Sequence, residues 1–415
     1  MKTPWELLKE SKTKIKTTWR IAFVSALVLG LLIHLPVMLS DIPNHDGLSS
    51  MYFDQNMITS GRWFLTVACG FSSYFTIPWV IGLIGLIWLG LTTAVLTEVL
   101  ELTDPVTITV VSGLLVSFPA LASTFAYVFT MDGYMLALFL AVLAVLFTAK
   151  YPRGYLTGAV CLAFSMGIYQ AYLPFTILLC VYKILLFFME EKGWEKKAKY
   201  VCRYLGMGIA GGVLYYVILQ ILLKLQGRVL DTYQGINSME QMGSGMGILT
   251  TLKGMYVDFL AFTVHGNVLV NNIFSLAACI ILVATVVFLV IRSMIWRKWW
   301  KNPAFFVIMI LLGISMPLLT NVILLISPNL TYHLLMRYQW VLYLILMTAF
   351  ADRYTAEESR TDVVLQWAAL CAAVVLVFDY GISDNIGYSN LEKKYEKTYA
   401  YCVRLLDRMC VISER

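Results

Sequence analysis

The strongest constraint on the fold of this chain is a series of apolar runs, each about long enough to cross a membrane as a helix. A hydrocarbon core of roughly 30 Å needs about 20 helical residues, and every backbone polar group must be paired inside it. Charged residues make up 13% of the 415, against about 25% in soluble domains. An all-α, polytopic transmembrane helical bundle is therefore predicted. Its eleven spans are 19–39, 76–97, 106–123, 134–149, 155–170, 172–189, 204–225, 268–291, 303–326, 339–352 and 363–380.

The distribution of Lys and Arg orients the bundle, because positive charge is retained on the cytoplasmic side. An N-terminus inside and a C-terminus outside place 20 of the 31 Lys and Arg in cytoplasmic segments. The short outer loops then hold only Arg62, Arg228, Lys253 and Arg337. The inner loops account for the net charge of +6, so no nucleic-acid partner is predicted.

The polar segments predicted to lie outside are 40–75, 124–133, 227–266 and 327–338. Helical spacing of Leu48, Met51 and Tyr52 predicts an interfacial helix over 47–60 in the first of them. The Gly- and Ser-rich run in 227–266 is either a mobile lid or a plain connector. Residues 381–415 are predicted to form a short extracytoplasmic amphipathic helix docked on the transmembrane domain 1–380.

Acidic residues just after the first span are the candidate catalytic groups. Asp46 lies a few residues beyond the span, where a partly desolvated carboxylate is a stronger base that can still contact a substrate hydroxyl. Asp46 could equally cap the next helix. Asp41 could be the base itself or position the acceptor. His45 is a candidate relay, and Asp54 is a more remote substrate-binding candidate.

Two arginines in the outer loops are the candidate phosphate ligands. A guanidinium binds a phosphoryl group through two hydrogen bonds and stabilises its charge. Arg62 could instead anchor headgroups beside Trp63, and a straight helix over 47–60 would hold it roughly 20 Å from Asp46. Arg337 is therefore the preferred candidate, with His333 and Tyr338 beside it.

Three further residues are candidate sugar-binding groups. Asp132 is a charge in a very short outer loop. Tyr169 and Gln170 lie where two spans turn outside, and they could hydrogen-bond a sugar or stabilise the turn. No Gly-rich phosphate-binding loop is present, so no nucleotide site is predicted. The cysteines show no CxxC and no spacing typical of metal ligands, and no metal or other cofactor is predicted.

Several motifs resemble one known family. They are Asp46 to Tyr52, Asp54-Gln55-Asn56, Ser60-Gly61-Arg62-Trp63, Ser73-Tyr74-Phe75, Pro78-Trp79, Met131-Asp132-Gly133-Tyr134, Gly167-Ile168-Tyr169-Gln170-Ala171 and Met336-Arg337-Tyr338. Their order resembles the bacterial type II serotype-converting (O-antigen) glucosyltransferases. The resemblance implies a GT-C-like fold in the bacterial cytoplasmic (inner) membrane. It also implies a polyprenyl-phosphate-linked sugar donor and an acidic base in the first outer loop, which here corresponds to Asp46 or Asp41.

The predicted function is transfer of a hexose, by resemblance glucose, from a polyprenyl-phosphate donor to a cell-surface polysaccharide on the outer face, with inversion. The partners are that donor, the polysaccharide acceptor and membrane lipids. A flippase or transporter for lipid-linked saccharides is the alternative, and it predicts ionisable residues deep within spans. A polysaccharide polymerase or ligase would share the outer-face chemistry.

Overall fold

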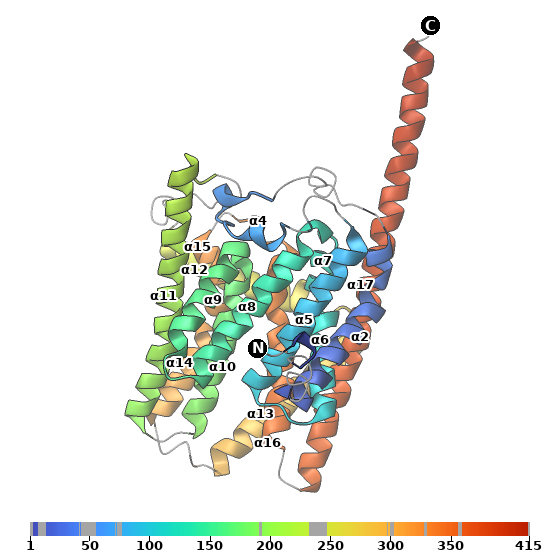
Figure 1. The fold of residues 1–415 in the computed structure, drawn as a ribbon. Coiled ribbons are helices and arrows are strands. Elements are labelled where there is room, and N and C mark those ends of the chain that lie inside the picture. Colours follow the sequence, from blue (N-terminus) through green and yellow to red (C-terminus); the bar gives the residue numbers. More distant parts are fainter. Residues whose placement is uncertain are drawn as a thin grey trace.

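The structure is a computed structural model that describes residues 3–6, 14–40, 42, 55–70, 72, 77–190, 193–231, 247–296, 298, 303–327, 330–355 and 359–413. Within these ranges the regular structure is helical, and the only β pairing is an isolated bridge between Met57 and Arg62. The prediction of an all-α chain is confirmed. Figure 1 shows most of the helices running alongside one another as a bundle.

The bundle consists of helices that range from 5 to 54 residues in length. In order they are α2 (Thr17–Leu39), α5 (Pro78–Leu100), α6 (Pro105–Ser117), α7 (Pro119–Phe125), α8 (Met131–Lys150), α9 (Gly154–Ile168), α10 (Leu173–Glu190), α11 (Trp194–Gln226), α12 (Ile248–Leu260), α13 (Ile273–Trp296), α14 (Pro303–Thr320), α15 (Val322–Ile326), α16 (Val341–Tyr354) and α17 (Arg360–Ser413). Short helices join them: η1 (Ile58–Ser60), α4 (Leu65–Ala68), η2 (Val128–Thr130), η3 (Gln170–Tyr172), η5 (Ala261–His265) and η7 (Leu334–Trp340).

Each predicted span coincides with apolar helix. In the part of the chain that the structure describes, eight helices are long and apolar enough to cross a membrane, and α6 with α7 could form a ninth, bent span. Two shorter apolar helices, α9 and α14, fall on two further predicted spans. The chain is therefore a membrane protein by the length and composition of its helices, whereas the count of eleven spans and the inside and outside assignments stay predictions.

The break between α6 and α7 follows from one proline. The two helices meet at an angle of 51°. Pro119 has no N–H to donate, and it forces the preceding residue out of the helical region. Phe118 accordingly has an extended backbone with ψ of 131°. The bend brings α7 beside η7, the helix that carries Arg337.

Small residues allow the first span to pack closely. Ala22, Ala26 and Gly30 are buried at four-residue intervals on one face of α2. A Cβ added to Gly30 would lie 2.5 Å from a methyl group of Leu86 on α5. This stripe of small residues is the usual way for membrane helices to approach, and it places the end of α2 beside the polar loops.

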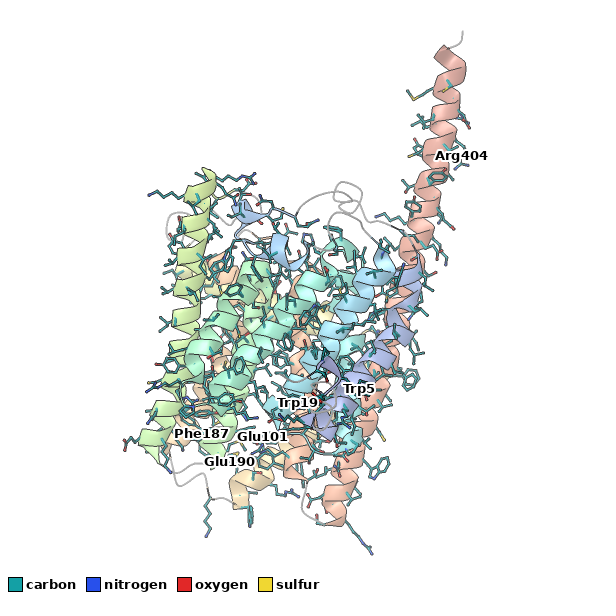
Figure 2. All side chains as sticks on the ribbon, viewed as in Figure 1. Trp5, Trp19, Glu101, Phe187, Glu190 and Arg404 are labelled. Carbon is teal, nitrogen blue, oxygen red and sulfur yellow. The ribbon has the colours of Figure 1, made fainter. Side chains whose placement is uncertain are left out.

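One end of the bundle carries most of the ion pairs, and we call it the basic end. Glu98 accepts from Lys16 and Lys150 at 2.6 and 2.9 Å. Glu101 pairs with Lys183 and Arg353 at 2.6 and 2.8 Å. Figure 2 shows Glu101 and Glu190 at this end, away from the projecting helix that carries Arg404.

The C-terminal segment corrects one prediction. Residues 381–415 were expected to dock on the bundle, but α17 continues through Gly381 as one helix of 54 residues. Residues 392–410 are exposed, and the helix projects beyond the bundle in Figure 1. No proline lies between 381 and 413, so nothing in the chain bends the helix back onto the bundle. The division into domains 1–380 and 381–415 stays a prediction.

Two loop predictions also change. A helix over 47–60 was expected, but residues 55–57 are not helical, and the following turn, η1, has three residues. Residues 43–54 lie outside the described residues. The segment 227–266 contains the helix α12, which the Gly- and Ser-rich composition had hidden. The run at 232–246 also lies outside the described residues, so neither the lid nor the connector is tested.

Candidate functional site

The site begins at a turn made by the Ser60-Gly61-Arg62-Trp63 motif. Gly61 has a left-handed backbone with φ of 77°, a conformation that glycine adopts without strain. The Gln170 amide donates to the Ser60 carbonyl at 3.2 Å and to the Tyr215 hydroxyl at 3.0 Å, and that hydroxyl donates to the Gly61 carbonyl at 3.0 Å. A Cβ on Gly61 would lie 2.5 Å from the Tyr215 hydroxyl oxygen and 2.7 Å from the Gln170 amide nitrogen. Two motifs about 110 residues apart therefore meet here.

The same turn directs Arg62 onto an aromatic pair. The rings of Tyr134 and Tyr169 stack with centroids 4.1 Å apart. The Arg62 guanidinium carbon lies 5.0 Å from the centre of the Tyr169 ring, within the usual range of a cation–π contact. Its Nη1 donates to the Tyr134 hydroxyl at 3.2 Å. Tyr134 belongs to the Met131-Asp132-Gly133-Tyr134 motif, so a third motif converges on this point.

Arg62 also lines a cavity with one polar side and an otherwise apolar wall. The cavity has a volume of about 80 Å³, which is room for a small polar group or a few waters. Arg62, Tyr169, Gln170 and Tyr215 form its polar side. The remaining wall is formed by Met166, Ala171, Leu173, Ile323, Ile326, Ser327, Leu330 and Met336. Met336 adds the Met336-Arg337-Tyr338 motif to the group.

Asp132 is buried beside this group rather than lining the cavity. It lies in the first turn of α8 with a relative exposure of 4%. Ser72 donates to its Oδ2 at 2.6 Å, and the Gly133 N–H donates to its Oδ1 at 2.9 Å. Burial, and then the nearby Asp132 carboxylate, raise the pKa of the Cys69 thiol. In this arrangement Asp132 fixes the chain around Ser72 and α8.

Arg337 is held in a bidentate ion pair that the sequence did not indicate. Its Nη1 and Nη2 donate to the two carboxylate oxygens of Asp258 on α12, each at 2.7 Å. Its Nε donates to the Tyr332 carbonyl at 3.2 Å. Asn321, at the break between α14 and α15, donates to the same carboxylate at 3.1 Å. The guanidinium also lies 4.0 Å from the centre of the Tyr332 ring.

The two neighbours predicted for Arg337 are separated. His333 is exposed, at the start of η7. Tyr338 is buried, and its hydroxyl donates to the Leu115 carbonyl inside the bundle. Its ring packs on Phe118 and Phe175, with centroids 6.3 and 5.9 Å away. Tyr338 therefore occupies the core between α6, α7 and α10.

The predicted catalytic acids, Asp41 and Asp46, lie outside the described residues. The same applies to the predicted relay His45 and to the substrate-binding candidate Asp54, which also lie between the end of α2 and Gln55. Within the described ranges no group of three His, Cys, Asp or Glu side chains could hold a metal ion. The expectation of a metal-free site stays a prediction.

A second polar cluster inside the bundle was missed. Tyr380, Asp384 and Tyr388 recur every four residues on one face of α17. Asp384 is 2% exposed, and neither of its oxygens has a hydrogen-bond partner among the described residues. Tyr388 hydrogen-bonds His34 of α2 at 2.6 Å, and the other His34 nitrogen bonds the Val116 carbonyl at 2.7 Å. The four-residue spacing in α17 was the available signal.

The fold and the converging motifs define a polytopic helical membrane protein with a polar, aromatic site at the end opposite the basic end. The family model described as glucosyl transferase GtrII matches residues 35–351. This match spans most of the bundle and all the motifs above, so the chain belongs to the GtrII glucosyltransferase family. Comparisons with curated proteins and with solved structures gave no match.

Proposed function

We propose that this glucosyltransferase takes glucose from a polyprenyl-phosphate-linked donor and transfers it to a cell-surface polysaccharide. The family match supports glucosyl transfer. A lipid-linked donor suits a membrane bundle whose cavity combines one guanidinium with an apolar wall. We place the reaction at the end of the bundle opposite the basic end, which we assign to the outer face of a bacterial inner membrane because Lys and Arg concentrate at the other end.

The position of Arg62 is the observation that carries this proposal. Arg62 lines the cavity beside Gln170, with Leu173 and Met336 opposite as apolar wall. Arg337 does not line this cavity, and its terminal nitrogens donate to Asp258. We therefore assign the donor phosphate to Arg62, and the packing of α12 against η7 to Arg337. The sequence had favoured Arg337 over Arg62 because a straight helix was predicted over 47–60. Residues 55–57 are not helical, so that reason for preferring Arg337 no longer applies.

The proposed step is a single inverting displacement. An acceptor hydroxyl attacks the anomeric carbon, the bond from that carbon to the phosphate oxygen breaks, and polyprenyl phosphate leaves with the bonding electrons. The hydroxyl proton passes to the carboxylate of Asp46 or Asp41. Arg62 offsets the charge that grows on the departing phosphate. Gln170 and the Tyr134–Tyr169 pair hold Arg62 and its turn in place.

The test uses the full chain, purified in detergent and supplied with polyprenyl-phosphate-glucose and cell-envelope glycan. Wild type should release polyprenyl phosphate only when both substrates are present. Arg62→Ala should lose most of this activity, and Arg62→Lys should retain part of it, because a point charge replaces a planar fork. Asp46→Asn and Asp41→Asn identify the base. Full activity in Arg62→Ala and in both aspartate variants would refute the mechanism.

A saccharide flippase is the second candidate, and Asp384 is the observation that favours it. Buried ionisable residues among membrane helices often mark transport pathways, and Asp384 is buried in the bundle four residues beyond the predicted span 363–380. A flippase would move the lipid-linked sugar across a vesicle membrane without releasing lipid phosphate. Release that depends on the acceptor supports transfer, whereas movement without release supports transport.

A further inference from the structure

A large cavity lies at the basic end, away from the proposed reaction. It has a volume of about 760 Å³, within the size range of ligand-binding sites. Its wall is formed where α10, α13, α16 and the start of α17 meet. We call it the basal groove, and its lining is Glu190, Phe288, Ile291, Arg292, Ser293, Ile295, Trp296, Arg353, Tyr354, Ser359 and Asp362.

One side of the basal groove is apolar and accessible. Ile291, Ile295 and Trp296 of α13 have relative exposures of 50%, 60% and 71%. α13 is one of the helices long and apolar enough to cross a membrane. In a bilayer this face meets acyl chains, and a tryptophan at a span end is typical of the interface with the headgroups. The groove is therefore open to lipid along its length.

The other side of the groove carries both signs of charge. Arg292 donates to Asp362, and to the Tyr354 carbonyl at 2.8 Å. Arg353 pairs with Glu190 at 2.8 Å. Among the described residues the lining thus contains two guanidiniums and two carboxylates, whose formal charges cancel. The side chains of Arg292, Arg353 and Glu190 are 34%, 27% and 43% exposed, whereas that of Asp362 is 2% exposed. Groups of both signs consequently face the opening.

The charges of the basal groove favour some lipid headgroups over others. Basic pockets between membrane helices bind anionic lipids, but a purely anionic headgroup brings no cation to the exposed Glu190 carboxylate. A headgroup with one phosphate and one ammonium complements accessible groups of both signs. A primary ammonium donates three hydrogen bonds to acceptors such as a carboxylate, whereas a quaternary ammonium donates none.

We propose that the basal groove binds one membrane phospholipid with a zwitterionic, primary-amine headgroup. Its phosphate contacts Arg292, its ammonium contacts Glu190, and its acyl chains lie along Ile291 and Ile295. Such a lipid joins α13 to α10 and α17 at the basic end. The inference does not depend on the proposed glucosyl transfer.

The test places the full chain in vesicles containing equal amounts of phosphatidylethanolamine, phosphatidylcholine and phosphatidylglycerol with identical acyl chains. Native mass spectrometry after extraction counts the lipids that stay bound. Wild type should retain one phosphatidylethanolamine, preferred over each of the others by roughly tenfold, about the effect of one charge-assisted hydrogen bond. Equal retention of all three, or preference for phosphatidylglycerol, would overturn the proposal.

Variants locate the lipid. The double substitution Arg292→Gln with Asp362→Asn removes the phosphate ligand and leaves the net charge unchanged, and it should abolish selective retention. Arg153→Gln is the matched control, because Arg153 lies at the same end but outside the basal groove. Glu190→Gln should shift the preference toward phosphatidylglycerol. If the double variant fails to fold, Glu190→Gln decides: unchanged selectivity in that variant refutes the proposed site.

Discussion

Replacing Gly61 by alanine tests the side-chain contacts around this turn, provided that the cost of backbone strain is measured separately at a second glycine. Gly61 and Gly227 both have left-handed backbones, with φ of 77° and 62°. Alanine in this conformation costs about 1 kcal/mol at either position. Among the described residues no atom lies within 4 Å of a Cβ added at Gly227, whereas one at Gly61 reaches Tyr215 and Gln170 at 2.5 and 2.7 Å. Gly227→Ala is therefore the matched control.

The extra cost at Gly61 can be worked out from the contacts that must move. The Gln170 amide and the Tyr215 hydroxyl can shift only by losing their hydrogen bonds to the Ser60 and Gly61 carbonyls. Each is a part-buried bond that contributes about 1 kcal/mol. The free energy of unfolding should thus fall by about 3 kcal/mol in Gly61→Ala and by about 1 kcal/mol in Gly227→Ala.

The assay is reversible unfolding of both variants in mixed detergent micelles, with glucosyl transfer measured below the transition. Gly61→Ala should lose most of its activity, because the moved side chains position the turn that carries Arg62. Gly227→Ala should keep its activity. Equal destabilisation of the two variants, or full activity in Gly61→Ala, would refute the reasoning.

Three further outcomes test other parts of the structure. Arg337→Ala should lower the free energy of unfolding by about 2–3 kcal/mol. This is less than the usual cost of breaking a buried ion pair, because the Asp258 side chain is 28% exposed. An unchanged free energy of unfolding would contradict the ion pair. Burial raises the pKa of Glu101, but hydrogen bonds from two cations outweigh it and lower that pKa. The stabilisation that the ionised Glu101 side chain provides is therefore lost as pH falls through its folded pKa. Between about pH 6 and pH 3, acid should lower the thermal midpoint of Glu101→Gln less than that of wild type. A maleimide reagent should label the exposed Cys402 but not Cys69, which is buried and has a raised thiol pKa; mass spectrometry of the labelled peptides decides this.

Apolar periodicity was enough to find the helices but not their continuity. Every predicted span coincides with helix because a run of about 20 apolar residues has few other structures open to it in lipid. The charged composition after Gly381 suggested a separate, docked helix. Helical hydrogen bonding continues through a change from apolar to polar residues, so α17 crosses that boundary unbroken.

The candidate site was partly visible in the sequence. Arg62, Tyr169 and Gln170 were each singled out, and the structure brings them together around one cavity. Their contact depends on the left-handed turn at Gly61, which a spacing argument cannot supply. Asp258 was missed because it lies in α12, inside a segment whose glycines and serines had suggested a loop. A counter-ion from a distant segment becomes visible only when the two segments are placed side by side.

The unbroken course of α17 also has a mechanical consequence. A helix with every hydrogen bond in place behaves as a stiff rod, and residues 392–410 extend it by roughly 30 Å. A tilt of the last span by about 10° would move the tip of that extension by roughly 5 Å relative to its base. A small tilt of the last span is thus converted into a larger displacement at the far end of the projecting helix. A spin label at Cys402 would read those movements directly.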